Sequence, residues 1–248
     1  MKGLGIIPAR FGSTRFPGKP LIEINGKSMI RRVIDQAKKC SSLSDVWVAT
    51  DDERIFKHVE EYGCKAFYTS EDCNSGTERI CELLSKIEND FDFVLNIQGD
   101  EPFVHVESLE ELSNALISSK TDIATLAVQI ENAEEANDSN RVKVVFSTSG
   151  RALYFSRSTI PFARNGEPDY FKHLGVYAFT TNALQQIKLL KPSSLELTES
   201  LEQLRALWHG YRIAVHVAEH APGPGVDTPD DLERVRALFL GLERSTVS

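Results

Sequence analysis

Short apolar runs alternate with helix-like segments through the first half of the chain. The runs that predict buried strands cover residues 4–8, 46–50, 64–68 and 93–97. Between and after them, helical spacing or capping residues predict helices near 29–37, 53–62, 75–89 and 107–119. This alternation is typical of an α/β fold with a doubly wound, mostly parallel sheet. Such sheets bind ligands beyond the carboxyl ends of their strands, so the loops there are the first places to look for chemistry.

The pattern changes near residue 122. Strand-like segments with short or irregular links follow at 122–129, 142–146, 152–155 and 174–179, and residues 147–150 suit a hairpin turn. We therefore expect a single α/β domain over 1–248, with an inserted, more antiparallel lobe at about 122–180 that covers a substrate or makes a dimer contact. The remaining elements are predicted as helices near 181–190 and 195–209, a strand at 213–217, and a last helix from about 228 to 242.

Composition narrows the class of protein. The 248 residues are 41% hydrophobic and 26% charged, which is ordinary for a soluble globular chain. The net charge of −8 disfavours nonspecific nucleic-acid binding. The sequence has no apolar stretch long enough for a transmembrane helix and no apolar signal core at its N-terminus. Four cysteines without a C-x-x-C spacing predict reduced thiols in a cytosolic protein rather than a disulfide framework or a zinc site.

A basic loop follows the first predicted strand. The stretch 5–21 carries Arg10, Arg15 and Lys19 among Gly, Ser, Thr and Pro, and it contains no acidic residue. Residues 1–32 as a whole hold seven Lys or Arg and one Glu, although the protein is acidic. Arginine forks, a lysine and glycine-rich backbone at a strand's carboxyl end favour a phosphate or polyphosphate site. The alternative is a solvated basic loop.

Two common phosphate motifs do not fit this loop. A Walker A motif has four residues between its glycine and the Gly-Lys pair, whereas five separate Gly12 from Gly18, and a proline follows the lysine. The Rossmann fingerprint G-x-G-x-x-G is also missing, because Gly3 and Gly5 precede or begin the predicted strand and Pro8 follows them.

Two carboxylates could share a metal ion. Asp100 directly follows the predicted strand at 93–97, and Asp227 directly precedes the last helix. Mg²⁺ prefers a few carboxylates together with substrate phosphate oxygens, so the pair is a candidate magnesium site. Each residue also has an ordinary structural role available to it: Asp100 as a turn former and Asp227 as an extra residue at a helix start.

Several polar residues farther along the chain are candidates for substrate contacts. Ser75 and Arg79 open a predicted helix, where a capping box from Ser75 to Glu78 is the alternative explanation. Alternation along a strand places His173 and Tyr177 on one face.

Charged residues near the lobe extend this set. Arg157 and Arg164 flank a short segment and could grip a sugar carboxylate or remain solvated. In the predicted helix 195–209, the core-facing stripe consists of Leu197, Leu201, Leu204 and Trp208. Amphipathicity does not explain why Glu202 and Gln203 border that stripe.

These motifs together resemble the 3-deoxy-manno-octulosonate (Kdo) cytidylyltransferases. The matching stretches are 7–10, 13–21, 75–79, 98–102, 154–157, 173–177, 201–205 and 225–229. They cover nearly the whole chain in order. The first motif is shared with other sugar nucleotidyltransferases, including the CMP-sialate synthetases, whereas the stretches at 173–177 and 201–205 point to the Kdo branch. The segment between Arg164 and His173 is shorter than expected in parts of the family.

The resemblance implies a Rossmann-like nucleotidyltransferase fold and a reaction in which CTP and Kdo give CMP-Kdo and pyrophosphate. It also implies Mg²⁺, a homodimer and the cytoplasm of a bacterium that makes lipopolysaccharide. Matched by motif, the triphosphate and cytidine contacts fall on Pro8, Ala9, Arg10, Ser13, Arg15, Lys19, Ser75, Arg79 and Gln98. The metal ligands are Asp100 and Asp227, and these two with Arg10 and Lys19 form the catalytic set. The sugar pocket is assigned to Arg157, Arg164, His173, Tyr177, Glu202 and Gln203.

Two other functions remain open at this point. One is transfer of CMP to a related acid sugar, such as 8-amino-Kdo or a sialic acid. The other is a non-catalytic nucleotide-binding protein on the same fold, which predicts that a carboxylate or basic residue of the catalytic set is missing. All four residues of that set are present in the chain.

Overall fold

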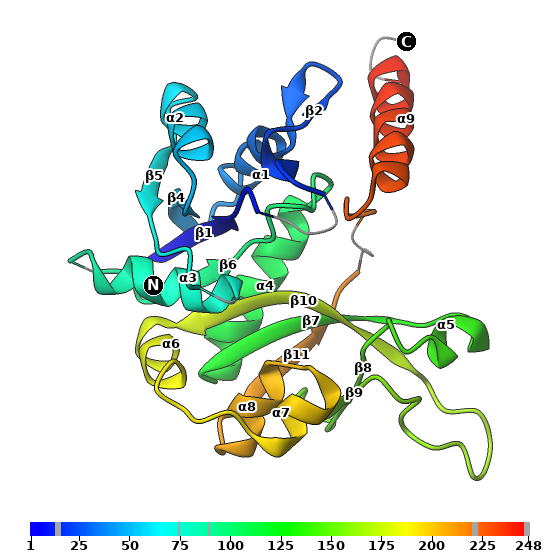
Figure 1. The fold of residues 1–248 in the computed structure, drawn as a ribbon. Helices are drawn as coiled ribbons and strands as arrows, with labels where there is room; N and C mark the ends of the chain where they lie inside the picture. Colours follow the sequence, from blue (N-terminus) through cyan, green and yellow to red (C-terminus); the bar gives the residue numbers. More distant parts are fainter. Residues whose placement is uncertain (13–15, 74, 89, 220–222, 246–248) are drawn as a thin grey trace. The chain divides into compact units, whose positions relative to one another are not determined.

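The computed structural model of the protein describes residues 1–12, 16–73, 75–88, 90–219 and 223–245 (Figure 1). The chain divides into two compact units. The terminal unit comprises Lys2–Phe91, Leu95–Leu109 and Pro222–Ser248, and the central unit comprises Met1, Asp92–Val94 and Glu110–Ala221. Among the described residues, no helix is both long and apolar enough to span a membrane.

Parallel strands form the sheet of the terminal unit. β1 (Gly3–Ala9) pairs in parallel with β4 (Leu43–Thr50), which pairs in parallel with β5 (Lys65–Tyr68). β6 (Phe93–Asn96), whose last two residues belong to this unit, neighbours β1 in the strand order, and the Ile97 N–H that follows β6 donates to the Ile6 carbonyl at 3.0 Å. β1 and β6 are almost wholly buried, as expected for strands covered on both faces of a sheet. The carboxyl ends of the parallel strands therefore share one edge.

Helices and a small hairpin complete the terminal unit. They are the 3-10 helix η1 (Lys19–Leu21), the hairpin of β2 (Glu23–Ile24) and β3 (Lys27–Ser28), α1 (Met29–Ala37), α2 (Glu53–Glu61), α3 (Gly76–Ser85) and α9 (Pro229–Ser245). α4 (Val106–Ser119) begins in the terminal unit and continues in the central unit. The predicted caps are present: Arg54 N–H donates to the Asp52 carboxylate at 2.9 Å, and Glu78 N–H donates to the Ser75 hydroxyl at 3.2 Å.

Antiparallel pairing dominates the central unit, as the pattern after residue 122 predicts. Its elements are β7 (Ile123–Gln129), α5 (Ala133–Asn137), β8 (Lys143–Phe146), β9 (Ala152–Ser156), β10 (Phe171–Thr180), α6 (Thr181–Ile187), α7 (Ser194–Glu199), α8 (Gln203–Trp208) and β11 (Ile213–Val217). β10 runs antiparallel to β7 and β8, and β8 runs antiparallel to β9, whereas β11 is parallel to β7. The predicted α/β class with an inserted antiparallel region is confirmed.

The prediction of one continuous helix over 195–209 is wrong. α7 ends at Glu199, Ser200 takes a left-handed conformation with φ 53°, and α8 begins at Gln203. The predicted stripe divides accordingly, because Leu201 and Leu204 are buried whereas Leu197 is 70% and Trp208 57% exposed. Tertiary bonds made by Glu199, described below, hold the chain in this break.

Candidate active site

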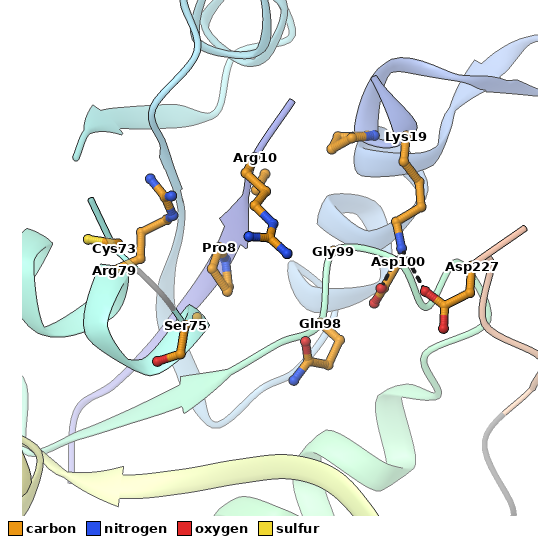
Figure 2. A pocket seen from close by; sticks show the side chains of 13 residues that line it. Pro8, Arg10, Lys19, Cys73, Ser75, Arg79, Gln98, Gly99, Asp100 and Asp227 are labelled. Atoms are coloured by element: carbon orange, nitrogen blue, oxygen red, sulfur yellow. Dashed lines mark hydrogen bonds and ion pairs between the residues drawn. The ribbon is translucent and has the colours of Figure 1, made fainter. Parts of the chain in front are cut away.

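A cavity of about 350 Å³ opens at the carboxyl edge of the strands in the terminal unit (Figure 2). Its walls come from the end of β1, the start of η1, the start of α3, the loop after β6 and the residues before α9. The lining residues are Pro8, Ala9, Arg10, Lys19, Pro20, Cys73, Ser75, Gly76, Arg79, Gln98, Gly99, Asp100 and Asp227. They include every residue predicted to bind the nucleotide or the metal except Ser13 and Arg15, which lie outside the described residues.

Lys19 joins the two predicted metal ligands. Its Nζ lies 2.7 Å from a carboxylate oxygen of Asp100 and 3.2 Å from one of Asp227. Because one ammonium group reaches both carboxylates, the two acids face a common position that a cation can occupy (Figure 2). In the described part of the chain, no group of three or more His, Cys, Asp or Glu side chains is arranged to hold a metal. A metal between these two carboxylates would therefore complete its coordination with water or phosphate oxygens.

Backbone and capping bonds fix the segment that carries Asp227. The Val226 N–H donates to the Asp100 carbonyl at 2.9 Å. The Thr228 N–H donates to the Asp231 carboxylate at 2.9 Å, and the Asp231 N–H donates back to the Thr228 hydroxyl at 3.2 Å. The bond from the Thr228 hydroxyl is the largest cause of the lowered pKa of the Asp231 carboxyl. These bonds begin α9 immediately after Asp227 and hold that residue beside Asp100.

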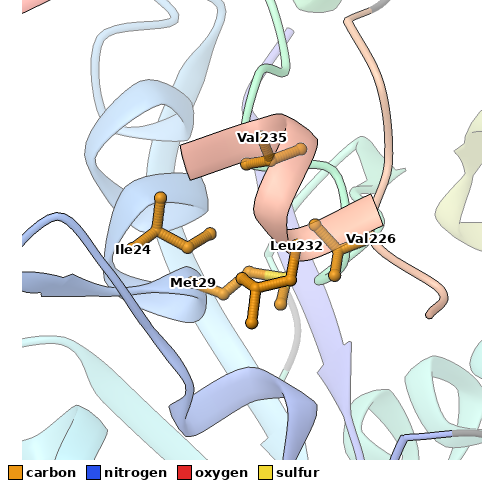
Figure 3. Packing of buried hydrophobic residues seen from close by; sticks show 5 residues of the cluster. All are labelled: Ile24, Met29, Val226, Leu232 and Val235. Atoms are coloured by element: carbon orange, nitrogen blue, oxygen red, sulfur yellow. The ribbon is translucent and has the colours of Figure 1, made fainter. Parts of the chain in front are cut away.

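A small apolar core anchors the same segment from behind (Figure 3). It consists of the buried side chains Ile24, Met29, Val226, Leu232 and Val235, with Phe16, Ile22, Phe103 and Phe239 packed against it. Val226 is thus buried on one side of the chain while its neighbour Asp227 lines the cavity. Packing of α9 against β2 and the start of α1 therefore sets the position of a candidate metal ligand.

Gly18 allows the chain to turn into η1 before Lys19. Its φ of 71° is in the left-handed region, and a Cβ there would lie 3.0 Å from the Phe11 ring. The Gly18 N–H donates to the Phe11 carbonyl at 2.9 Å. The guanidinium carbon of Arg54 lies 3.3 Å from the centroid of the Phe11 ring, and Asp52 binds the same guanidinium. Both ends of the basic loop are therefore packed, and Lys19 leaves the turn toward the carboxylates.

Arg79 lines the cavity, but its guanidinium is bonded within the protein. It is buried and donates to the Asp51 carboxylate at 2.6 Å, the Thr69 hydroxyl at 2.5 Å and the Ser70 carbonyl at 3.3 Å. These bonds tie α3 to the residues that follow β4 and β5. The structure thus supports a role for Arg79 in shaping the wall of the cavity.

Cys73 lines the cavity and is bonded to Glu82, although the sequence pattern did not single out either residue. The Glu82 carboxylate accepts bonds from the Ser70 N–H at 3.0 Å and the Cys73 thiol at 3.0 Å, and it pairs with Lys86 at 2.6 Å. Burial opposes ionisation of Glu82, but these bonds outweigh it and lower the pKa to about 2. Burial, with the bond to Glu82 as a second cause, raises the pKa of the Cys73 thiol to about 11. The bond between Cys73 and Glu82 is visible only in the folded structure, because no local sequence pattern indicates it.

The predicted sugar residues all belong to the central unit. The rings of His173 and Tyr177 lie with centroids 5.4 Å apart on β10, across a register shift between Leu174 and Tyr177. The buried Thr125 hydroxyl lies at this irregularity, 3.0 Å from His173 Nε2 and 2.7 Å from the Val176 carbonyl. Burial lowers the pKa of His173 to about 3, so its imidazole is neutral at pH 7.

Two buried polar atoms in this region have no hydrogen-bond partner among the described residues. They are the Tyr177 hydroxyl and the Gln203 Nε2 amide nitrogen. Burial, and to a lesser extent the charge of Glu202, raises the pKa of the Tyr177 hydroxyl, which places Glu202 near it. A buried polar group without a partner is costly, and such groups commonly await a ligand or water.

The two arginines of the predicted sugar set differ. The Arg157 side chain donates to the carbonyls of Glu199, Ser139 and Ser200 at 2.8, 3.2 and 3.4 Å. Arg164 is exposed on the segment between β9 and β10. The structure thus fixes Arg157 beside the break between α7 and α8, from which Glu202 and Gln203 follow, and it leaves Arg164 at the surface.

Known proteins resemble this chain over almost its full length. A family profile described as cytidylyltransferase matches residues 4–213. A protein from Pseudoalteromonas atlantica named 3-deoxy-manno-octulosonate cytidylyltransferase is 46% identical over 244 residues, which cover 94% of this chain and 96% of that protein. The chain belongs to the 3-deoxy-manno-octulosonate cytidylyltransferase family. The protein is therefore an enzyme of the nucleotidyltransferase class.

Further comparisons agree with this assignment. A relative of the same name from Photorhabdus laumondii is also 46% identical, with 94% of this chain and 97% of that protein covered. Among solved structures, a CMP:2-keto-3-deoxy-manno-octonic acid synthetase complexed with CTP superposes with a TM-score of 0.93 at 44% identity, covering 97% of this chain and 99% of the other. The predicted fold and family are both confirmed.

Proposed function

We propose that the protein transfers CMP from CTP to the anomeric hydroxyl of Kdo, giving CMP-Kdo and pyrophosphate for lipopolysaccharide synthesis. The observation that carries this proposal is the cavity in which Arg10 and Lys19 lie with Asp100 and Asp227 at the carboxyl edge of the parallel strands. That combination of cations and carboxylates suits a metal-bound triphosphate. The solved relative complexed with CTP supports the choice of nucleotide.

We further propose that Asp100 and Asp227 hold Mg²⁺ together with the substrate phosphates. The fit is supported by Lys19, whose ammonium already lies within 3.2 Å of both carboxylates and shows that they converge on one cation. Two carboxylates with phosphate and water oxygens match the preference of Mg²⁺ for oxygen ligands. When bound, the metal would polarise the phosphate oxygens and lower the pKa of a coordinated hydroxyl.

The protein side chains have separable roles in this reaction. The anomeric oxygen of Kdo forms a bond to the α-phosphorus, the bond from that phosphorus to the pyrophosphate oxygen breaks, and the hydroxyl proton passes to solvent. Arg10 and Lys19 offset the negative charge that gathers on the phosphates as two anions approach. Asp100 is a poor base in this role, because a carboxylate that binds a cation attracts a proton weakly.

We assign the sugar to the central unit through Arg157, His173, Tyr177, Glu202 and Gln203. Support comes from the Tyr177 hydroxyl and Gln203 Nε2, the two buried polar atoms to which a polyhydroxy ligand would supply partners. A neutral His173 can donate or accept a hydrogen bond to a sugar hydroxyl without adding charge. Arg164, which is exposed, would reach an acid sugar from the surface.

A homodimer in the cytoplasm completes the proposal. The central unit exposes large apolar side chains, among them Leu153, Leu197 and Trp208, which suit an interface between subunits. The four cysteines are free thiols, in keeping with a reducing compartment. Light scattering coupled to gel filtration tests the dimer: a mass of one chain at micromolar concentration would contradict it.

A pyrophosphate-release assay tests the reaction. We expect turnover with CTP, Kdo and Mg²⁺, little turnover with UTP, and none after chelation of the metal. Parallel reactions with 8-amino-Kdo and a sialic acid separate the two related activities from the proposed one. If either sugar is turned over faster than Kdo, that sugar is the substrate instead of Kdo. CTP binding without turnover of any sugar would favour a non-catalytic role.

A further inference from the structure

Lys143 is a fully buried lysine without a carboxylate among its hydrogen-bond partners. The side chain at the start of β8 is 0% exposed. Its Nζ donates to the carbonyls of Asp138, Arg141 and Arg157 at 2.9, 2.6 and 2.6 Å, so its three N–H groups are all used. Burial lowers the pKa of Lys143, because the ammonium form is poorly solvated there. A buried charge of this kind costs stability, so an apolar residue would serve better if packing were its only purpose.

The bonds of Lys143 converge on a residue of the proposed sugar site. One of its three acceptors is the carbonyl of Arg157 itself. The other two belong to the turn 138–141, and within that turn the Ser139 carbonyl accepts a bond from the Arg157 side chain at 3.2 Å. Lys143 therefore fixes both the backbone of Arg157 and a segment that binds its guanidinium.

Glu199 also holds Arg157. It follows Arg157 in the sequence, whereas Lys143 precedes it. Its carboxylate accepts bonds from the Arg157 N–H at 2.9 Å and the Ser156 hydroxyl at 2.7 Å, and its carbonyl accepts from Arg157 Nε at 2.8 Å. The next residue, Ser200, accepts from the same guanidinium at 3.4 Å and begins the bend that leads to Glu202. Three of the five guanidinium N–H groups thus donate to carbonyls, which fixes the plane of the guanidinium.

We propose that Lys143 and Glu199 are positioning residues for Arg157, and that through it they set the affinity of the enzyme for the carboxylate of its sugar substrate. The inference rests on the proposed function, since it takes Arg157 to bind the acid sugar. A guanidinium held in place before binding loses little conformational freedom when the carboxylate arrives. Carbonyl acceptors leave its positive charge in place, whereas a carboxylate acceptor would offset the charge.

The sheet offers a matched control. Lys172 on β10 is the register partner of Lys143, but its Nζ pairs with Glu135 at 2.8 Å. The variants Lys143→Met and Lys172→Met remove the same charge from neighbouring positions, and only the first removes the support of Arg157. We expect Lys143→Met to raise the KM for the acid sugar about tenfold or more, because buried carbonyls lose their donor, and Lys172→Met to change it less than about twofold. The Kd for CTP, measured by calorimetry, stays unchanged in both.

A substrate analogue separates positioning from general loss of structure. In the analogue a carboxamide replaces the sugar carboxylate. Wild-type enzyme is expected to prefer the acid, and the ratio of kcat/KM for acid over amide falls in Lys143→Met. An unchanged ratio would overturn the proposal, because a merely structural defect weakens both substrates alike. If Lys143→Met does not fold, Glu199→Gln decides by the same ratio: a reduced ratio supports the proposal and a wild-type ratio overturns it.

The wild-type reaction distinguishes this inference from the function on which it rests. If the enzyme uses a different acid sugar, the ratio is measured with that sugar and its amide, and the inference stands or falls as before. If no acid sugar is a substrate, the proposed function fails, and the inference fails with it.

Discussion

The ammonium of Lys19 lies 2.7 Å from the carboxylate of Asp100, although Lys19 begins η1 and Asp100 lies in the loop after β6. Lys19 also reaches Asp227 at 3.2 Å. Under the proposed function, the same side chain would have two partners: the carboxylates when no metal is bound, and the triphosphate when a metal occupies the position between them. This competition can be measured.

Replacing Lys19 with methionine should separate these two partners. In the nucleotide-free protein we expect Lys19→Met to bind Mn²⁺, used as a spectroscopic substitute for Mg²⁺, more tightly than wild type, because no ammonium offsets the two carboxylates. The same variant should bind CTP more weakly. Electron paramagnetic resonance measures free Mn²⁺, and calorimetry measures CTP binding. Equal Mn²⁺ affinity in the two proteins would contradict the proposed competition.

Asp100→Asn should abolish turnover and preserve the fold. The amide retains the size of the side chain but loses the charge that pairs with Lys19 and that, in the proposed function, holds the metal. We expect kcat to fall by at least about 100-fold, as when a group that acts on the transition state is removed. Asp230→Asn, at an exposed position in the first turn of α9, is the control and should retain activity. Near-normal turnover of Asp100→Asn at saturating Mg²⁺ would exclude Asp100 as an essential ligand.

Shortening Leu232 should destabilise the terminal unit and disturb Asp227. This side chain is 6% exposed in the core that holds α9, so Leu232→Ala should lower the free energy of unfolding by about 2–5 kcal/mol. Leu238→Ala is made on the same helix at a position that is 48% exposed, and it should cost far less. Urea unfolding gives both values. Similar losses in the two variants would show that the core does not anchor the helix.

The Cys73 thiol should react slowly despite lining the cavity. Its pKa of about 11 leaves little thiolate at pH 8, and the thiolate is the reactive form. Because the Glu82 carboxylate accepts the bond from the thiol, Glu82→Gln should lower the pKa of Cys73 and speed its alkylation by iodoacetamide. Mass spectrometry of the modified peptide gives the rates. A fast reaction in wild type, or a slower one in the variant, would argue against this electrostatic coupling.

The imidazole of His173 should remain neutral from pH 8 to about pH 4. Its pKa in the folded protein is about 3, well below the value of about 6.5 in an unfolded chain. A depressed folded-state pKa contributes stability that is complete above pH 6.5 and is lost as pH falls from 6.5 toward 3. Nuclear magnetic resonance of the ring nitrogens tests this expectation. A ring that titrates near pH 6.5 would contradict it, and His173→Gln should remove this contribution to the pH dependence of unfolding.

The sequence predicts well which residues line the cavity of the terminal unit, because their positions depend on local patterns. Asp100 lies in the loop after β6, and Lys19 begins η1 after the loop that follows β1. These two strands are neighbours in the sheet, and both residues line the cavity beyond them. The cap at Thr228 likewise predicts where α9 starts and so where Asp227 lies.

Elements held by distant bonds are poorly predicted. The helical spacing of apolar residues over 195–209 indicates one helix. The helix is interrupted at Ser200, next to Glu199, which bonds to Ser156 and Arg157. No local sequence pattern indicates bonds between residues that are far apart in the chain. For the same reason Lys143 and Glu82 show no special pattern in sequence, although each organises residues of a proposed binding region through contacts with other segments.

The hydrogen bond from the Val226 N–H to the Asp100 carbonyl indicates the order in which parts of the chain fold. Contacts between residues far apart in sequence require closure of a long loop, so they are expected to form late in folding. The cation position between Asp100 and Asp227 exists only once α9 has packed on the core around Met29. A partly folded chain would lack that position, and catalytic activity would therefore report completion of the fold rather than its beginning.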